Sequence, residues 1–193
     1  SSFMDSTLLN ENYPMSVYNF CKKNDIEEKT FYKYFGSFDA VKKMIWQSFY
    51  DNAISLLEKD KDFRDSSPKE KLLSFYYTFF EILLLNRRYI LFVLSKEEKI
   101  LNKISDLKTL RINFKAFATE LIEEGNTEKP SYLQHPPKIF SEAAWVQLGF
   151  LLKFWVDDTS ESFEKTDQAI EKSVQTAFDV FENTPLSTLI DFG

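Results

Sequence analysis

The chain has 193 residues, with 24 Lys and Arg against 30 Asp and Glu, and 44% of its residues are hydrophobic. This apolar content excludes a disordered chain, and a single cysteine excludes an internal disulfide framework. A net charge of −6 argues against unspecific coating of nucleic acid by the whole molecule. No apolar run approaches the roughly 18 residues of a bilayer span, and the first residues do not have the pattern of a signal peptide. We therefore expect a cytoplasmic protein without a membrane span.

The N-terminal part contains short segments of helical periodicity followed by a longer one: Phe3–Leu9, Val17–Cys21, Thr30–Phe35, and Phe38 toward Leu57. Two short helices joined by a tight polar turn bury too little surface to be stable alone, so they must pack on their neighbours. This arrangement is that of a helix-turn-helix, which presents its second helix to the major groove of DNA. Helix pairs with tight turns also occur in plain bundles, so spacing alone leaves both interpretations open.

Longer helical patterns fill the rest of the chain. The strongest runs from Pro68 to Asn86, and Ser67, Pro68 and Glu70 supply a cap, a first residue and a capping box for it. Further helices are predicted over Arg88–Asn102, Ile104–Glu124, Lys138–Val156 and Ser162–Asn183. Gly125-Asn126 is a helix stop, and the prolines between residues 126 and 137 predict a loop. With no alternating strand of convincing length, the sequence predicts an all-α protein of about nine helices.

Residues of catalytic type do not converge in this sequence. His135 is the single histidine and has no cysteine or second histidine with which to share a metal. Cys21 falls on a predicted buried face and is expected to be a small core residue. Adjacent acidic residues point in different directions on a helix, and no Gly-rich phosphate loop occurs. We therefore expect no enzyme, no catalytic residue, no metal site and no cofactor.

Residues 16–35 resemble the DNA-binding signature of the TetR family of bacterial regulators. The most specific part is Thr30-Phe31-Tyr32-Lys33-Tyr34-Phe35, which such proteins write as Thr/Ser-Leu/Phe-Tyr-x-His/Tyr-Phe. Ser37, followed by Asp39-Ala40-Val41, resembles the start of the family's fourth helix. The resemblance covers about residues 3–55, and the remainder agrees in its number of helices. It implies a helix-turn-helix DNA-binding domain over residues 1–58 and a helical ligand-binding and dimerisation domain over residues 59–193.

The DNA contacts that this resemblance implies are Ser16, Lys29, Thr30, Tyr32, Lys33 and Tyr34. The serine begins the first helix of the pair, where hydroxyl and amide groups could hold a phosphate. The two lysines and the threonine would point at base edges, and the tyrosines would place hydroxyls on phosphates of double-stranded operator DNA. In the alternative interpretation, Tyr32 and Phe35 are core residues and the lysines are ordinary solvated charge.

The departures from the family pattern fall on DNA-facing positions. Asn24-Asp25 replaces the usual Ala-Gly at the turn, although Asn or Asp can adopt the left-handed backbone. Glu27 is a poor helix cap, and Phe38 occupies a position where the family often places a lysine on a phosphate. Residues 16–45 contain six lysines against four acidic residues, a net of +2. Because phosphate neutralisation supplies much of the affinity for DNA, we expect weak and strongly salt-sensitive binding.

The aromatic-rich helices after residue 68 must either fill a core or line a cavity. In TetR-like proteins this domain holds an apolar effector between its helices, which implies a ligand pocket around Phe79, Phe114, Phe117 and Trp145. Plain core packing is the alternative for each of these rings. The family also dimerises through its last two long helices, and the small and apolar residues of Lys138–Val156 and Ser162–Asn183 suit a homodimer.

A second resemblance concerns the segment Trp155-Val156-Asp157-Asp158-Thr159-Ser160, with Phe163, Thr166 and Ile170 downstream. It is similar to the C-terminal region of lipid-binding accessory proteins of ubiquinone biosynthesis, which share the TetR fold and do not act as repressors. Two hypotheses follow. The first is a DNA-binding transcriptional regulator whose operator affinity is modulated by a small apolar ligand. The second is a TetR-fold lipid- or isoprenoid-binding protein that no longer binds DNA.

Overall fold

The computed structural model describes residues 1–95, 106–127, 129–131 and 134–183, and these ranges contain ten α-helices and no strand. The predicted all-α fold is therefore confirmed. The helices are α1 (Ser2–Leu9), α2 (Val17–Lys23), α3 (Glu28–Tyr34), α4 (Phe38–Leu57), α5 (Lys61–Asp65), α6 (Pro68–Leu84), α7 (Arg87–Ser95), α8 (Lys108–Asn126), α9 (Pro137–Asp157) and α10 (Glu164–Asn183), with a short 3₁₀ turn, η3 (Glu161–Phe163), before α10.

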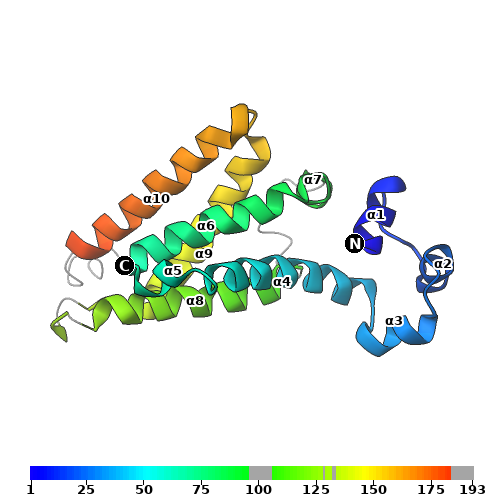
Figure 1. Cartoon of the computed structure of the whole chain (residues 1–193), viewed down its shortest axis with the longest axis horizontal. Helices are drawn as coiled ribbons and strands as arrows, with labels where there is room; N and C mark the ends of the chain where they lie inside the picture. The colour runs from blue at the N-terminus through cyan, green and yellow to red at the C-terminus, as the bar shows by residue number, and fades with distance from the viewer. Residues whose placement is uncertain (96–105, 128, 132–133, 184–193) are drawn as a thin grey trace.

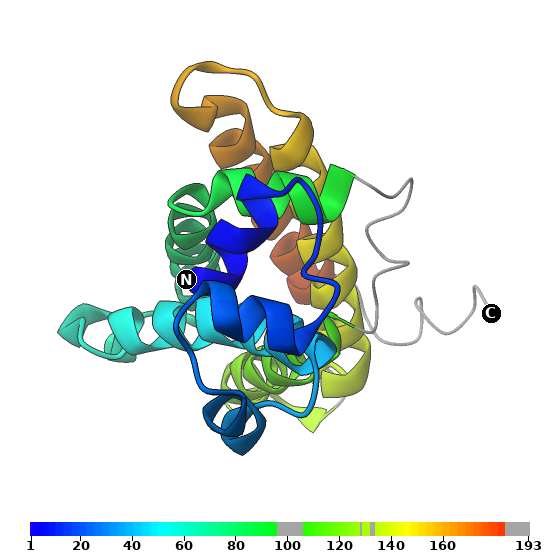
Figure 2. The ribbon, with the colours of Figure 1, turned by 90° about the vertical axis from the view of Figure 1, so that its right-hand side faces the viewer.

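The molecule has two parts, and α4 connects them (Figure 1). We call α1, α2, α3 and the first turns of α4 the head, and the bundle of α6 to α10 the body. The later turns of α4 pack on α6 and α8, while α9 packs on α8 and α10 packs on α6 and α9. Viewed from the head, α1 lies against α7, which is the second place where head and body meet (Figure 2). Because α4 belongs to both parts, the domain boundary after residue 58 stays a prediction.

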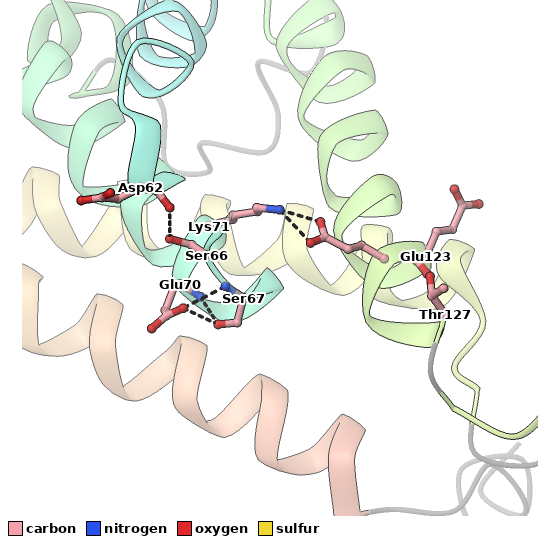
Figure 3. Close-up of polar contacts among 8 residues, drawn as sticks. Asp62, Ser66, Ser67, Glu70, Lys71, Glu123 and Thr127 are labelled. Carbon is pink, nitrogen blue, oxygen red and sulfur yellow. Dashed lines mark hydrogen bonds and ion pairs between the residues drawn. The ribbon is translucent and has the colours of Figure 1, made fainter. Parts of the chain in front are cut away.

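The start of α6 follows the predicted capping box. The Ser67 hydroxyl accepts a hydrogen bond from the Glu70 amide at 3.3 Å, and the Glu70 carboxylate accepts one from the Ser67 amide at 2.8 Å (Figure 3). These reciprocal bonds satisfy two amides that have no partner inside the helix. In the next turn Lys71 pairs with Glu124 at 2.7 Å, which fixes the start of α6 beside the end of α8.

The helix α8 ends near the predicted position, but a side-chain contact and not a glycine stop ends it. Gly125 and Asn126 both lie inside α8, and neither adopts a left-handed backbone. Instead, the Asn126 side chain donates to the His135 carbonyl at 2.9 Å and accepts from the His135 amide at 3.0 Å. This buried pair replaces the expected glycine stop, because it holds the following loop against the end of the helix. The segments predicted as helix over residues 96–105 lie outside the described residues, and sequence reasoning did not foresee α5.

Helix α9 is long and apolar enough, by length and composition alone, to cross a bilayer, and it is the one such helix among the described residues. Its apolarity has a local cause, because the helix has two apolar faces. One face, which includes Leu148, Leu152 and Trp155, is buried in the bundle. The other includes the exposed side chains of Ile139 and Phe150. A bundle helix that meets two neighbours satisfies a hydropathy criterion without any membrane.

Candidate nucleic-acid interface

Four phenylalanine rings hold the head together. Phe38 lies 5.5 Å from Phe3, 5.5 Å from Phe20 and 5.6 Å from Phe31, measured between ring centroids. We call Phe3, Phe20, Phe31 and Phe38 the head ring cluster. Three of these rings are buried, and they bring α1, α2, α3 and α4 to one point. Phe38 therefore helps to set the position of α3, although the family often uses that position for a phosphate-binding lysine.

The turn between α2 and α3 has the backbone that the sequence predicted. Asp25 adopts a left-handed conformation with φ of 54°, and the Ile26 amide donates to the Cys21 carbonyl at 2.9 Å. The Asn24 side chain donates to the Phe20 carbonyl at 2.8 Å, which closes the end of α2. Cys21 is buried beside this turn, as expected, and burial raises the pKa of its thiol, with Glu28 adding to the effect. The turn thus fixes how α3 leaves α2.

The predicted DNA contacts of α3 are all exposed: Lys29, Thr30, Tyr32, Lys33 and Tyr34. Tyr32 retains 55% of its side-chain exposure and Tyr34 67%, so neither tyrosine is a core residue. Phe31 alone in this helix is buried, and it anchors α3 to the head ring cluster. The alternative interpretation of Tyr32 as a core residue is therefore wrong, whereas the role of these side chains toward DNA stays a prediction.

These exposed residues lie on two faces of α3. Lys29 and Lys33 are four residues apart and share one face, and the Lys33 ammonium lies 5.4 Å from the Tyr34 ring centroid. Thr30 and Tyr34 share another face and line a cleft of about 460 Å³ against α1 and α4. Ser16 is half-buried, and its hydroxyl caps α2 by accepting from the Asn19 amide at 3.3 Å. The six predicted contacts therefore do not form one continuous strip.

The charges of the head are balanced close to α3. Glu27 and Glu28 are exposed at its start, and Glu27 provides no side-chain cap, as the sequence predicted. Lys42 is bound to Asp39 at 2.9 Å and lies 4.3 Å from the Tyr13 ring centroid, so it is occupied within the protein. In the described part of the chain, Lys29 and Lys33 form no salt bridge. They are the cations of α3 that remain available for a phosphate or a base edge.

The predicted ligand-pocket residues lie together in the body. Phe114 is 6.4 Å from Phe117 and 6.5 Å from Trp145, and the Phe75 ring is 5.5 Å from Phe79 and 5.2 Å from Phe114. Phe79 and Phe114 are completely buried, and Trp145 is nearly so. Phe117 is half-buried and also lines a surface cleft beside α4. These rings pack on one another as a core does, and their role in holding a ligand stays a prediction.

The outer face of α9 and α10 forms an apolar groove of about 490 Å³. Small residues, including Ala143 and Ala177, line it beside the exposed ring of Phe150. The floor is polar, because Gln147 accepts from the Tyr76 hydroxyl at 3.0 Å and donates to the Ser173 hydroxyl at 2.9 Å. A shallow surface of small and apolar residues allows a second pair of helices to approach closely.

Arg87 holds the connection between α9 and α10, residues 158–163, which we call the elbow. Sequence reasoning missed this cationic contact, which we call the Arg87 clamp. The Arg87 guanidinium, at the start of α7, donates to the Trp155 carbonyl at 3.1 Å and to the Asp158 carbonyl at 3.4 Å. It lies 4.4 Å from the Trp155 ring and 4.5 Å from the Phe163 ring. Burial lowers the pKa of Arg87, and Asp158 opposes that shift. The clamp thus joins α7 to the elbow through both charge and ring stacking.

Asp158 organises the other side of this elbow. Its buried carboxylate accepts from the Ser160 amide at 2.8 Å and hydroxyl at 2.7 Å, and from the Thr166 amide at 2.9 Å and hydroxyl at 2.6 Å. Burial alone would raise the pKa of Asp158, but these four bonds outweigh it and lower the pKa to about 2. Trp155, Asp158, Phe163 and Thr166, which carry the resemblance to the lipid-binding accessory proteins, therefore have a structural role here. The spacing from Asp158 to Ser160 and Thr166 was the available sequence signal.

A model of the family described as "Tetracyclin repressor-like, C-terminal domain" matches residues 71–193, more than half of the chain. No curated protein and no solved structure matches the chain. The matched region begins in α6 and includes α7 to α10, so it covers the body. The match does not extend to the head, which lies before residue 71.

Proposed function

The chain belongs to the TetR family of tetracycline repressor-like proteins, and from this membership we propose that it is a DNA-binding transcriptional regulator whose operator affinity is modulated by a small apolar ligand. The geometry of α3 is the observation that supports DNA binding best. This helix lies at the end of the molecule away from the body (Figure 1), and its exposed side chains include two lysines without salt bridges among the described residues.

In the proposed complex, α3 enters a major groove and the head ring cluster holds it at a fixed angle to α2. Lys29 and Lys33 approach base edges or phosphates, and the hydroxyls of Tyr32 and Tyr34 contact the backbone. Ser16, at the start of α2, lies where a phosphate oxygen can approach the first amides of that helix. Because only a few cations are available, affinity should fall steeply as salt is raised.

Control by a ligand would act through the connection of head and body. The core rings Phe79, Phe114, Phe117 and Trp145 are the proposed ligand contacts, and they lie on α6, α8 and α9. Since α4 packs on α6 and α8, a ligand that separates these helices would shift α4 and with it the head. Differential affinity of the ligand for the two arrangements would be the driving force.

A homodimer is part of the proposal. The groove on α9 and α10 would receive the same helices of a second copy, with Phe150 and the small residues around it at the centre. Exposed Val146 and Ile139 extend this face along α9. Two heads on one dimer would contact two half-sites, which adds affinity that a single weakly basic head lacks.

Electrophoretic mobility of the DNA upstream of the gene, at low and at moderate salt, tests the DNA-binding step. The wild-type protein should retard this DNA at low salt, and the double variant Lys29→Ala, Lys33→Ala should not. The matched control is Lys108→Ala, Lys138→Ala, which removes two exposed lysines from the body and should leave the shift intact. If both double variants lose the retardation equally, binding is an unspecific attraction between charges. If the wild-type protein does not retard the DNA at low salt, the proposal is wrong.

The alternative proposal is a lipid- or isoprenoid-binding protein of the same fold. The observation that favours it is Phe38, which joins the head ring cluster where the family often has a phosphate-binding lysine, beside exposed Glu27 and Glu28. A co-purified lipid seen by mass spectrometry, together with no DNA shift at low salt, would select this alternative. A DNA shift that depends on Lys29 and Lys33 would reject it.

A further inference from the structure

A second site on the body lies outside the α9–α10 groove. A cleft of about 290 Å³ opens between α4, α5 and α8. Its lining contains three aromatic rings, Tyr50, Phe63 and Phe117, and two carboxylates, Glu58 and Glu120. The three rings are half-buried and the two carboxylates are exposed, so the cleft has an apolar wall and an acidic rim.

The two carboxylates of the acidic rim are not paired with a cation by a salt bridge in the described part of the chain. Neither Glu58 nor Glu120 forms a salt bridge there. The nearby Arg64 donates to the backbone carbonyl of Glu58 at 3.5 Å and forms no salt bridge with its carboxylate among the described residues. Two negative charges beside half-buried aromatic rings produce a region of negative potential above an apolar surface.

The Tyr50 hydroxyl shows that both carboxylates act on the same small volume. It donates to the Asn113 carbonyl at 3.2 Å, at the wall formed by α8. Burial raises the pKa of Tyr50, and the charges of Glu120, Asp51 and Glu58 raise it further. Burial disfavours charge of either sign, but the charges of Glu120 and Glu58 act against a further negative charge in the cleft and in favour of a positive one.

Two rings of the cleft also pack against the aromatic core. Tyr50 lies 5.7 Å from Phe75, and Phe75 lies 5.1 Å from Phe117, one of the proposed ligand contacts. An apolar group bound in the cleft would therefore contact rings that support the stack between α4, α6 and α8. The carboxylates would remain at the mouth of the cleft, where water still reaches them.

From this arrangement we infer that the cleft between α4, α5 and α8 binds a small organic cation with an aromatic or otherwise apolar body. The ring faces of Tyr50, Phe63 and Phe117 contact the apolar body, and Glu58 and Glu120 balance the positive charge. The inference goes beyond the proposed function, because it adds a site for a cationic ligand beside the site proposed for the apolar effector, with which it shares Phe117. Binding itself does not depend on that function.

Benzyltrimethylammonium is a suitable probe, because its quaternary nitrogen cannot deprotonate and its ring matches an aromatic wall. Isothermal titration of the full chain at low salt, without DNA, should show one saturable site. The double variant Glu58→Gln, Glu120→Gln keeps the shape of the rim and should bind about tenfold more weakly. Higher salt should weaken wild-type binding and reduce this difference, because screening acts on exposed charges.

Two controls make the result specific to the cleft. Glu123→Gln removes an exposed carboxylate from the same helix as Glu120 but away from the lining, and it should bind the probe as the wild type does. Neopentylbenzene, the neutral isostere of the probe, should bind more weakly than the cation. Equal binding of the isostere, equal binding by the double glutamine variant, or no binding of the cation by the folded wild type would each overturn the inference.

The same protein then separates this inference from the proposed function. If the cation binds through Glu58 and Glu120 but no DNA shift occurs at low salt, the inference that the cleft binds a cation is supported and the regulator proposal fails. If DNA is shifted through Lys29 and Lys33 while the cation does not bind, the regulator proposal stands and the assignment of the cleft fails.

Discussion

The helices of the head are held to one another by other kinds of contact than the helices of the body. In the head, α1 to α4 meet through the rings of Phe3, Phe20, Phe31 and Phe38. In the body, ring contacts are combined with directional bonds between helices, such as Tyr76 to Gln147 and Gln147 to Ser173. Apolar packing is non-directional, whereas a hydrogen bond loses strength when its geometry changes. The difference predicts that the helices of the head separate more easily than those of the body.

The joint between the two parts agrees with this view. Tyr13, in the loop after α1, packs edge-on against Phe92 of α7 with the ring centroids 5.3 Å apart. The other connection is α4, whose later turns are buried against the body. Since α7 begins at the Arg87 clamp, the elbow of α9 and α10 is linked to the head through one helix. The following predictions test the contrast, starting with the largest expected effect.

Phe31→Ala should remove the anchor of α3 and destabilise the head. The ring is 5% exposed and contacts Phe20 and Phe38, so its deletion should cost about 3–4 kcal/mol of unfolding free energy. Hydrogen exchange followed by mass spectrometry should show faster exchange of α2 and α3 amides, while α6, α8 and α9 remain protected. Equal loss of protection in the body would mean that the two parts do not differ as described.

The neighbouring Tyr32→Ala is the matched control for this prediction. Tyr32 also loses an aromatic ring but is 55% exposed, so its unfolding free energy should change by less than about 0.5 kcal/mol. If Tyr32→Ala weakens DNA binding without loss of protection, the Tyr32 side chain is a contact to DNA and not a support of the fold.

Arg87→Met should destabilise the body by about 2 kcal/mol, because carbonyl acceptors at the elbow lose a charged donor. Methionine keeps much of the side-chain volume between the rings of Trp155 and Phe163. Chemical denaturation should show the loss, and Arg88→Met, which changes an exposed arginine beside it, should not. Arg87→Lys should restore only part of the stability, since an ammonium cannot reach several carbonyls and stack at once.

The sequence was sufficient for local features whose partners are close along the chain. The capping box of Ser67 and Glu70 follows from neighbours within a few residues and was predicted. The sequence also allowed a left-handed residue at Asn24-Asp25, and the structure has it at Asp25. The Arg87 clamp joins residues about 70 positions apart, and nothing in a single sequence marks which arginine meets which carbonyl. The cleft at Glu58 and Glu120 was missed for the same reason, because three separate helices create it.

The helix stop at Gly125-Asn126 shows a limit of residue preference. Glycine favours a left-handed helix end, but Gly125 stays helical here. The tertiary pair of Asn126 with the His135 backbone ends the helix instead. Similarly, the rings of Phe79 and Phe114 suggested a cavity by their size, and the structure packs them against Phe75. Composition alone does not distinguish a filled core from a lined pocket.

Asp158→Asn should change how the stability of the body depends on pH. The pKa of Asp158 is lowered from 3.8 to about 2 in the folded protein, so its contribution is complete above pH 3.8 and is lost as pH falls toward 2. Between pH 5 and 2.5, the unfolding free energy of the wild type should therefore fall by about 1 kcal/mol more than that of Asp158→Asn. Thermal unfolding across this pH range measures the difference. Parallel curves would show that the carboxylate charge does not support the elbow.

The smallest expected effect returns to the head, where a change of one backbone preference should raise stability. Asp25 has φ of 54°, a region that glycine adopts without the steric cost of a β-carbon. Asp25→Gly should therefore stabilise the head by about 0.5 kcal/mol, since the greater chain entropy of glycine offsets part of the gain. Asn24→Gly should do the opposite, because Asn24 has φ of −105° and its side chain closes α2 at the Phe20 carbonyl. Compared with the wild type, amide exchange in α2 and α3 should be slower in Asp25→Gly and faster in Asn24→Gly. Exchange in α9 should be unchanged in both variants. If Asp25→Gly also slowed exchange in α9, the head and the body would unfold as one unit, and the predicted difference in stability between them would be wrong.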